Sequence, residues 1–116
     1  LLARLQWLAA GLAELVAAAR AARGEAPILV TPPASNAPLS LLPEEVRRRF
    51  AAANKRFVET LRQAADRRGL PLVDLRAATE RGGQAQGQLY IDTNHLWPEA
   101  WHRAFAQHAV LPESAR

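Results

Sequence analysis

Two short apolar runs, at residues 27–31 and 70–75, constrain the fold of this chain more than any other feature. Both are rich in Leu, Ile and Val, lie between turn-forming residues and lack alternating polar positions, which is typical of strands that are buried on both faces. A long segment with a helical pattern precedes each run. Helices and strands that alternate in this way predict parallel strands covered by helices.

The helical segments have recognisable ends. The first ends near Gly24, the second begins at Pro43 and stops at Gly69, and the last begins at Pro98 after a polar, Gly-rich connection at 81–88. Proline suits a first helical turn and glycine suits the position after a helix. Apolar residues recur at the spacing of one helical face, and we expect these stripes to be buried. They are Leu1, Leu5, Leu8, Leu12, Leu15 and Val16 in the first helix, and Val46, Phe50, Phe57 and Leu61 in the second.

The expected fold is a three-layer α/β/α domain with a parallel sheet. Two strands are too few for such a sheet, because parallel sheets normally have about five strands and two would leave long uncovered edges. The chain also opens with Leu1, inside a helical pattern that has no start signal before it. We therefore expect residues 1–116 to be the C-terminal part of a single domain whose N-terminal part is missing.

Composition narrows the possible functions. The 116 residues contain no cysteine, which excludes disulfides, thiolate metal sites and cysteine nucleophiles. The net charge of +4 raises the question of nucleic-acid binding. However, nearly all basic residues are arginine, as a high-GC genome would produce, and the runs at 47–49 and 67–68 have no aromatic residues interleaved. We expect these runs to be solvated helix faces and predict no nucleic-acid partner.

A membrane span is the other question, raised by the apolar first twenty residues. Arg4, Gln6, Glu14 and Arg20 interrupt them, and no small-residue cleavage site follows. We therefore predict no membrane contact from this segment.

Asp92 and His95 are the candidate catalytic residues. They lie three positions apart in an irregular segment just before Pro98. A carboxylate hydrogen-bonded to one imidazole nitrogen fixes the tautomer and stabilises the imidazolium, so that the other nitrogen can take a proton from a serine hydroxyl. The alternative interpretation is an Asp cap beside a surface His.

The order of these parts resembles the second half of the SGNH (GDSL-like) hydrolase superfamily. The similarity rests on a helix, the strand and turn at 28–33, a long helix, the strand at 72–75, and a Tyr-x-Asp-x-x-His block at 90–95 followed by a last helix. The run 92–101, Asp-Thr-Asn-His-Leu-Trp-Pro-Glu-Ala-Trp, is most similar to members that handle acyl groups at the cell envelope, such as the D-alanyl transfer protein of teichoic acid modification.

This resemblance implies a flavodoxin-like fold in which Asp92 and His95 serve a Ser-His-Asp triad. It implies an ester hydrolase or O-acyltransferase that needs no cofactor or metal, acts on a small-molecule or glycan-linked ester, and works in the periplasm or cell envelope. The family's Gly-Asp-Ser block and its oxyanion-hole Gly and Asn would precede the first helix and are not in this sequence. A glycine often found after the His is replaced by Pro98-Glu99-Ala100. The chain alone is therefore expected to be inactive.

Three residues near the Asp92–His95 segment are candidates for substrate binding. Ser35 and Asn36 lie in the Pro-rich loop at 32–38, which leaves the same sheet edge as the triad would, and Trp97 adjoins the His. Their alternative roles are turn closure for Ser35 and Asn36 and packing for Trp97. The serines Ser35, Ser40 and Ser114 do not lie in a Gly-x-Ser-x-Gly elbow, so none is predicted as the nucleophile.

The remaining polar candidates have structural interpretations. Asp74 is predicted to cap a strand end. His102 and His108 are expected to be solvated on the last helix, and a metal site built from Asp92, His95 and His102 is not predicted. The competing view of the whole chain is a non-catalytic interaction or structural domain in which Asp92 and His95 only fix a loop.

Overall fold

The structure is a computed structural model that describes residues 2–24 and 27–111. The helices are α1 (Leu2–Arg23), α2 (Glu44–Arg68), α3 (Leu75–Thr79) and α4 (Pro98–Gln107), with 3₁₀ turns at Leu39–Leu41 and Gly87–Leu89. The strands are β1 (Leu29–Val30), β2 (Leu72–Val73), β3 (Glu80–Arg81), β4 (Gln84–Ala85) and β5 (Ala109–Val110).

The main sheet has the strand order β1-β2-β5. β1 and β2 pair in parallel, with Leu29 opposite Leu72, which confirms the parallel pairing predicted for the two apolar runs. β5 was not predicted, and it pairs antiparallel to β2, with Val110 opposite Leu72. The described sheet is therefore small and mixed, and the larger parallel sheet of a three-layer domain stays a prediction.

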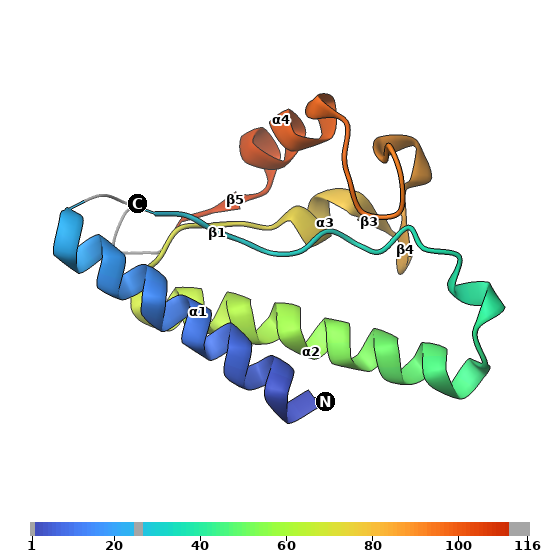
Figure 1. The fold of residues 1–116 in the computed structure, drawn as a ribbon. Helices are drawn as coiled ribbons and strands as arrows, with labels where there is room; N and C mark the ends of the chain where they lie inside the picture. The colour runs from blue at the N-terminus through green and yellow to red at the C-terminus, as the bar shows by residue number, and fades with distance from the viewer. Residues whose placement is uncertain (1, 25–26, 112–116) are drawn as a thin grey trace.

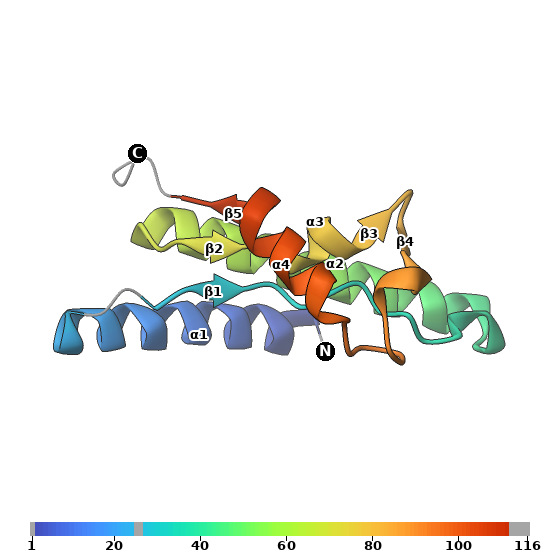
Figure 2. The ribbon, with the colours of Figure 1, turned by 90° about the horizontal axis from the view of Figure 1, so that it is seen from above.

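Helices lie on both sides of this sheet. Figure 1 shows α1 and α2 together below β1 and β2, and α4 above them. Seen from above in Figure 2, β1 runs along α1, and α4 crosses over the chain just beyond the ends of β1 and β2. Within the described ranges 2–24 and 27–111, no helix is long and apolar enough to cross a membrane.

The contact between α1 and α2 is made by small side chains. Ala9 and Ala13 of α1 are fully buried, as are Ala64 and Ala65 of α2, and an ion pair joins Arg68 to Glu14. In the predicted stripe of α1, Leu8, Leu12 and Leu15 are exposed instead, to 52%, 39% and 68%, and Val16 is partly buried. Leu1 and the side chain of Leu5 lie outside the part of the chain that the structure describes. The burial prediction was wrong for the three exposed leucines, because alanines allow two helices to approach closely and the helix turns its alanine face to α2.

The ends of α2 lie where the sequence placed them. Pro43 is its N-cap, and Gly69, with φ of 63°, is its left-handed C-cap. Leu61 is buried as predicted, whereas Val46 and Phe50 are exposed. Figure 1 shows that the N-terminal half of α2 extends past the end of the sheet, so the strands do not cover these two side chains.

A cluster of buried residues, separate from the contact between α1 and α2, supports the C-terminal region. It joins β2 and α3 to the segment at 89–96 and to α4, and its members are Val73, Leu75, Ala78, Leu89, Tyr90, Leu96, Ala100 and Ala104. The Gly-rich connection before it forms a β3–β4 hairpin, turned by Gly82 and Gly83 with φ of 60° and 79°. Glycine is favoured there because other residues rarely adopt positive φ.

Candidate functional site

Residues 90–96 form a loop whose two ends pair with each other and are buried in the core. Its ends, Tyr90 and Leu96, form an antiparallel bridge and are both 6% exposed. Inside this bridge the amide of Ile91 donates to the carbonyl of His95 at 2.8 Å, and just outside it the amide of Trp97 donates to the carbonyl of Leu89 at 3.0 Å. We call residues 90–96 the Asp-His loop.

Asp92 is held at the centre of this loop by backbone amides. Its Oδ1 accepts from the amides of Asn94 at 3.0 Å and of His95 at 2.8 Å. These two hydrogen bonds lower the pKa of Asp92 below its usual value, with a smaller contribution from the His95 side chain. Asp92 is therefore a carboxylate at neutral pH and is held in position by the loop backbone.

His95 is oriented by that carboxylate. Its Nδ1 lies 2.8 Å from Oδ2 and 3.0 Å from Oδ1 of Asp92. A carboxylate at Nδ1 keeps the proton of the neutral ring on that nitrogen, so that Nε2 has the free lone pair. The side chain of His95 is 73% exposed and that of Asp92 is 51% exposed, so a group that does not belong to this loop can reach the imidazole ring. The pair can act as a general base, and the same geometry also suits an Asp-closed surface turn.

The Pro-rich loop at 32–38 lies against the Asp-His loop. The amide of Asn36 donates to the carbonyl of Thr93 at 2.9 Å, and its side-chain Nδ2 donates to the carbonyl of Asp92 at 3.3 Å. The hydroxyl of Tyr90 donates to the carbonyl of Ala34. Two loops that lie far apart in the sequence are therefore in contact here, and the prediction that the Pro-rich loop borders a substrate site stays a prediction.

The three predicted substrate-binding residues have different surroundings. Asn36 uses its side-chain amide to hold the Asp-His loop, while Ser35 Oγ accepts from the amide of Ala37 at 3.3 Å and closes a turn. Trp97 precedes α4 as its N-cap residue and is 48% exposed. Ser35 and Asn36 thus lie close to the Asp-His loop, where Ser35 closes a turn and Asn36 holds the loop. Trp97, two residues after His95, is half-exposed.

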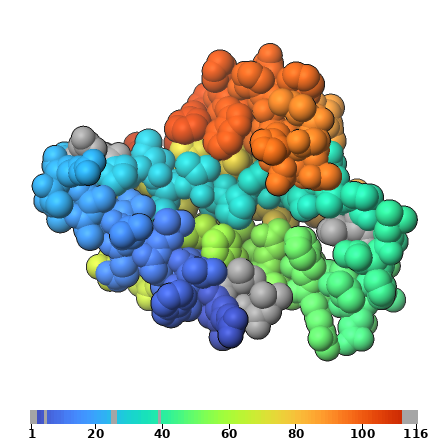
Figure 3. All heavy atoms as spheres, in the orientation of Figure 1, coloured from blue at the N-terminus to red at the C-terminus, as the bar shows by residue number. Residues whose placement is uncertain are grey.

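A groove next to this site was not predicted. It has a volume of about 510 Å³ and lies between the Pro-rich loop, α2 and the Asp-His loop. Its lining residues are Pro32, Pro33, Ser35, Phe50, Ala53, Asn54, Phe57 and Asn94. Figure 3 shows the face on which the orange C-terminal part, the teal Pro-rich segment and the green helix α2 meet. Phe50 and Phe57 were expected in the core, but Phe50 is exposed and Phe57 is only partly buried, which the sequence pattern did not reveal.

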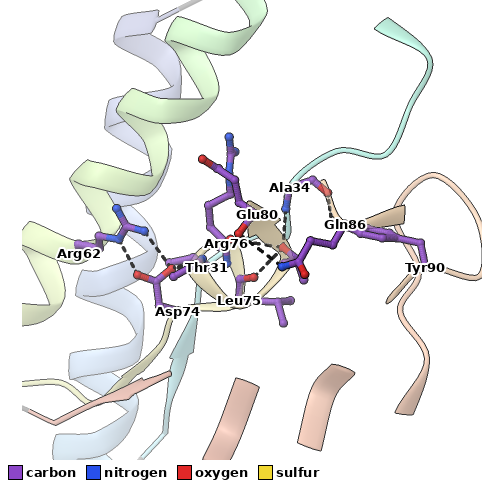
Figure 4. A network of polar contacts seen from close by, with 11 residues as sticks. Thr31, Ala34, Arg62, Asp74, Leu75, Arg76, Glu80, Gln86 and Tyr90 are labelled. Atoms are coloured by element: carbon purple, nitrogen blue, oxygen red, sulfur yellow. Dashed lines mark hydrogen bonds and ion pairs between the residues drawn. The ribbon is translucent and has the colours of Figure 1, made fainter. Parts of the chain in front are cut away.

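Asp74 was predicted to cap a strand end; it follows β2 and caps the short helix α3, which the sequence analysis did not predict. Its Oδ1 accepts from the amide of Ala77 at 3.0 Å and so caps α3, and from the hydroxyl of Thr31 at 3.2 Å. Arg62 donates to both carboxylate oxygens, at 2.7 and 3.0 Å. Figure 4 shows Arg62 reaching from α2 to Asp74, with Thr31 beside it. The Arg62 contact links two elements, and no local sequence pattern indicates it.

Two opposing effects set the pKa of Asp74. Burial raises it, but the hydrogen bonds from Arg62, Ala77 and Thr31, together with the charge of Arg62, lower it more. The net result is a pKa below the usual value, so Asp74 is charged in the folded protein at neutral pH.

The other histidines do not join the Asp-His loop in a metal site. His102 is exposed on α4, and His108 is the C-cap of that helix, where its carbonyl accepts from the amide of Asp74 at 2.8 Å. Among residues 2–24 and 27–111, no group of three or more acidic or histidine side chains is arranged to hold a metal ion.

Comparison with known proteins adds no relative. No family model, no curated protein and no solved structure matches this chain. The interpretation of the site therefore depends on the geometry of the Asp-His loop and on the sequence resemblance.

Proposed function

We propose that this chain supplies the acid and base of a Ser-His-Asp triad in an SGNH-like ester hydrolase or O-acyltransferase. The observation that carries this proposal is the 2.8 Å contact between Asp92 Oδ2 and His95 Nδ1, in a loop that fixes the carboxylate through two backbone amides. In the proposed reaction, Nε2 of His95 takes the proton of a serine hydroxyl as the serine attacks the ester carbonyl. Asp92 stabilises the imidazolium that forms.

The serine and the oxyanion donors would come from a part of the domain that precedes this chain. Three features support such a part. β1 lies at one edge of the described sheet, and the half-exposed Ile28 precedes it. The exposed leucines of α1 form an apolar face that a further element of the same domain would cover. α1 runs back along β1, which is the arrangement of a helix that connects an earlier parallel strand to β1 (Figure 2).

The first test uses the 116-residue chain. Without a nucleophile, the Asp92–His95 pair has nothing to activate, so we expect no hydrolysis of p-nitrophenyl acetate above the buffer rate. Turnover that depends on His95 in this chain alone would contradict the proposal that the nucleophile lies elsewhere.

The second test uses the complete polypeptide that the reading frame upstream of Leu1 encodes. We expect that frame to contain a Gly-Asp-Ser-like block followed by Gly and Asn blocks, and the product to hydrolyse p-nitrophenyl acetate. His95→Ala should then lower kcat by about 10³-fold or more. His102→Ala, an exposed histidine on α4, is the matched control and should leave kcat within about twofold. Equal loss in both variants, or a start codon close to Leu1, would refute the proposal.

A non-catalytic domain is the second candidate function, and one observation favours it. Both carboxylate oxygens of Asp92 contact groups of Asn94 and His95 only two and three residues away, as they would in a structural turn. A fluorophosphonate probe separates the two functions. An enzyme is labelled at its serine in the complete polypeptide and is labelled more slowly after His95→Ala, whereas a structural domain is not labelled.

A further inference from the structure

We infer that the 510 Å³ groove between α2 and the Pro-rich loop binds the apolar acyl group of an ester. This inference rests on the proposed function and names the substrate class of that same site. We call this groove the acyl groove.

The walls of the acyl groove are mostly apolar. α2 contributes the rings of Phe50 and Phe57 and the methyl group of Ala53, and the opposite wall contains Pro32 and Pro33. Its other lining residues, Ser35, Asn54 and Asn94, are polar and uncharged. An apolar concave site with a few neutral polar groups suits an aliphatic or aromatic group. Because no cation is among these lining residues, a charged head group would lie outside the groove while the apolar part of the ligand occupies it.

The acyl groove is continuous with the Asp-His loop. Asn94 lines the groove, and its own amide donates to Oδ1 of Asp92 at 3.0 Å. Ser35 also lines it and lies between Ala34 and Asn36, which are both hydrogen-bonded to residues of the Asp-His loop. A group in the groove therefore lies against the same loop that presents His95, as an acyl chain must when its carbonyl is to be attacked near that ring.

A different surface suits a protein partner better. Trp7, Leu8, Leu12 and Leu15 of α1 form an exposed face on a helix surface, which another helix or strand of the domain can cover. The acyl groove is instead concave and contains polar groups that can orient a small ligand. We therefore assign the groove to the acyl group and the α1 face to protein.

Binding of fatty acids to the ¹⁵N-labelled 116-residue chain tests this assignment without any chemistry. Octanoate should shift the amide signals of Ser35, Ala53, Asn54 and Asn94. Each buried methylene tightens binding by up to about fourfold, so octanoate should bind at least about tenfold more tightly than butyrate. Saturable shifts confined to the groove would support the assignment. Shifts centred on Leu8 and Leu12, or no difference between the two acids, would overturn it.

Variants of α2 provide the matched control. Phe50 is 42% exposed and Val46, one turn earlier on the same helix and outside the groove, is 46% exposed, so the fold should tolerate alanine at either position. Phe50→Ala should weaken octanoate binding about tenfold, and Val46→Ala should leave it unchanged. An equal effect of both would overturn the inference.

Two further measurements separate this inference from the proposed function. His95→Ala should retain full octanoate binding, because the groove does not require the base. If the groove binds octanoate but the complete polypeptide has no esterase activity, the proposed function fails while the groove remains a site for apolar ligands. If the complete polypeptide hydrolyses esters but no longer binds octanoate, protein fills the groove and the inference is wrong.

Discussion

Asp74 and Asp92 make the same local hydrogen bond in very different surroundings. Each carboxylate accepts from the backbone amide three residues later, from Ala77 in one case and from His95 in the other. Asp74 is 8% exposed and is bound by Arg62 and Thr31, which come from other elements. Asp92 is exposed, and its side chain contacts only its own loop.

The difference shows what decides the role of such an aspartate. Both aspartates close the same kind of turn. They differ in the side chain that contacts the rest of the carboxylate, which is Arg62 for Asp74 and His95 for Asp92. The partly exposed guanidinium of Arg62 and the hydroxyl of Thr31 make Asp74 a structural anchor between α2, the end of β1 and α3. An accessible imidazole makes Asp92 suitable for proton transfer.

The largest expected effect that distinguishes them is on stability. Asp74→Ala removes the cap of α3 and leaves Arg62 without its partner. We expect the free energy of unfolding to fall by about 2–3 kcal/mol, less than for a fully buried pair because 42% of the Arg62 side chain is exposed. Urea denaturation followed by circular dichroism measures this change.

Two controls accompany that measurement. Asp92→Ala should change the stability far less, because its contacts are local and solvated. Asp66→Ala, an exposed position on α2, should be close to neutral. If Asp92→Ala were as destabilising as Asp74→Ala, the distinction between an anchor and a presented carboxylate would be lost.

The helix ends could be predicted because their signals are local, and the parallel pairing of the two apolar runs could be predicted because helices and strands alternate along the chain. Pro43 and Gly69 mark the ends of α2 through backbone chemistry that needs no tertiary context. Which face of α1 is buried could not be predicted, because the helix is apolar nearly all round. Its burial depends on how closely α2 approaches the alanines at 9 and 13.

The candidate site shows the same division. The Asp92–His95 contact follows from a spacing of three in an irregular segment, and Asp74 could be interpreted as a cap from its position after a strand. The bond from Arg62 and the groove at Phe50 depend on residues brought together by the fold, over separations that no local pattern records. For the same reason, no local pattern indicates that β5 pairs antiparallel to β2 or that Asn36 holds the Asp-His loop.

A smaller effect is expected at Tyr90, which connects the exposed Asp-His loop to the buried interior. Its ring is in the core, and its hydroxyl donates to the carbonyl of Ala34 in the Pro-rich loop. Tyr90→Phe keeps the ring and removes that donor, so the free energy of unfolding should fall by about 1 kcal/mol. The amide signals of Asn36 and Thr93 should shift, because the two loops lose one of their connections. Tyr90→Leu, which also loses the ring, should cost more; equal costs would show that the hydroxyl contributes nothing.

The smallest expected effect is on the pH dependence of stability. Both aspartates have pKa values lowered by folding, Asp74 by Arg62 and backbone hydrogen bonds that outweigh its burial, and Asp92 by the amides of Asn94 and His95. A carboxylate with a lowered pKa contributes its full stabilisation above its unfolded value, near 3.8, and loses it as the pH falls through the folded value. The free energy of unfolding should therefore decline below about pH 4.

Because the contacts of Asp74 link three elements, Asp74→Asn should flatten this decline more than Asp92→Asn does. Urea denaturation between about pH 2.5 and 6 measures how steeply the free energy of unfolding changes with pH, because these limits lie roughly one unit or more on either side of the usual carboxylate pKa. An equal flattening by the two variants would mean that the local turn, and not the Arg62 contact, dominates both pKa values.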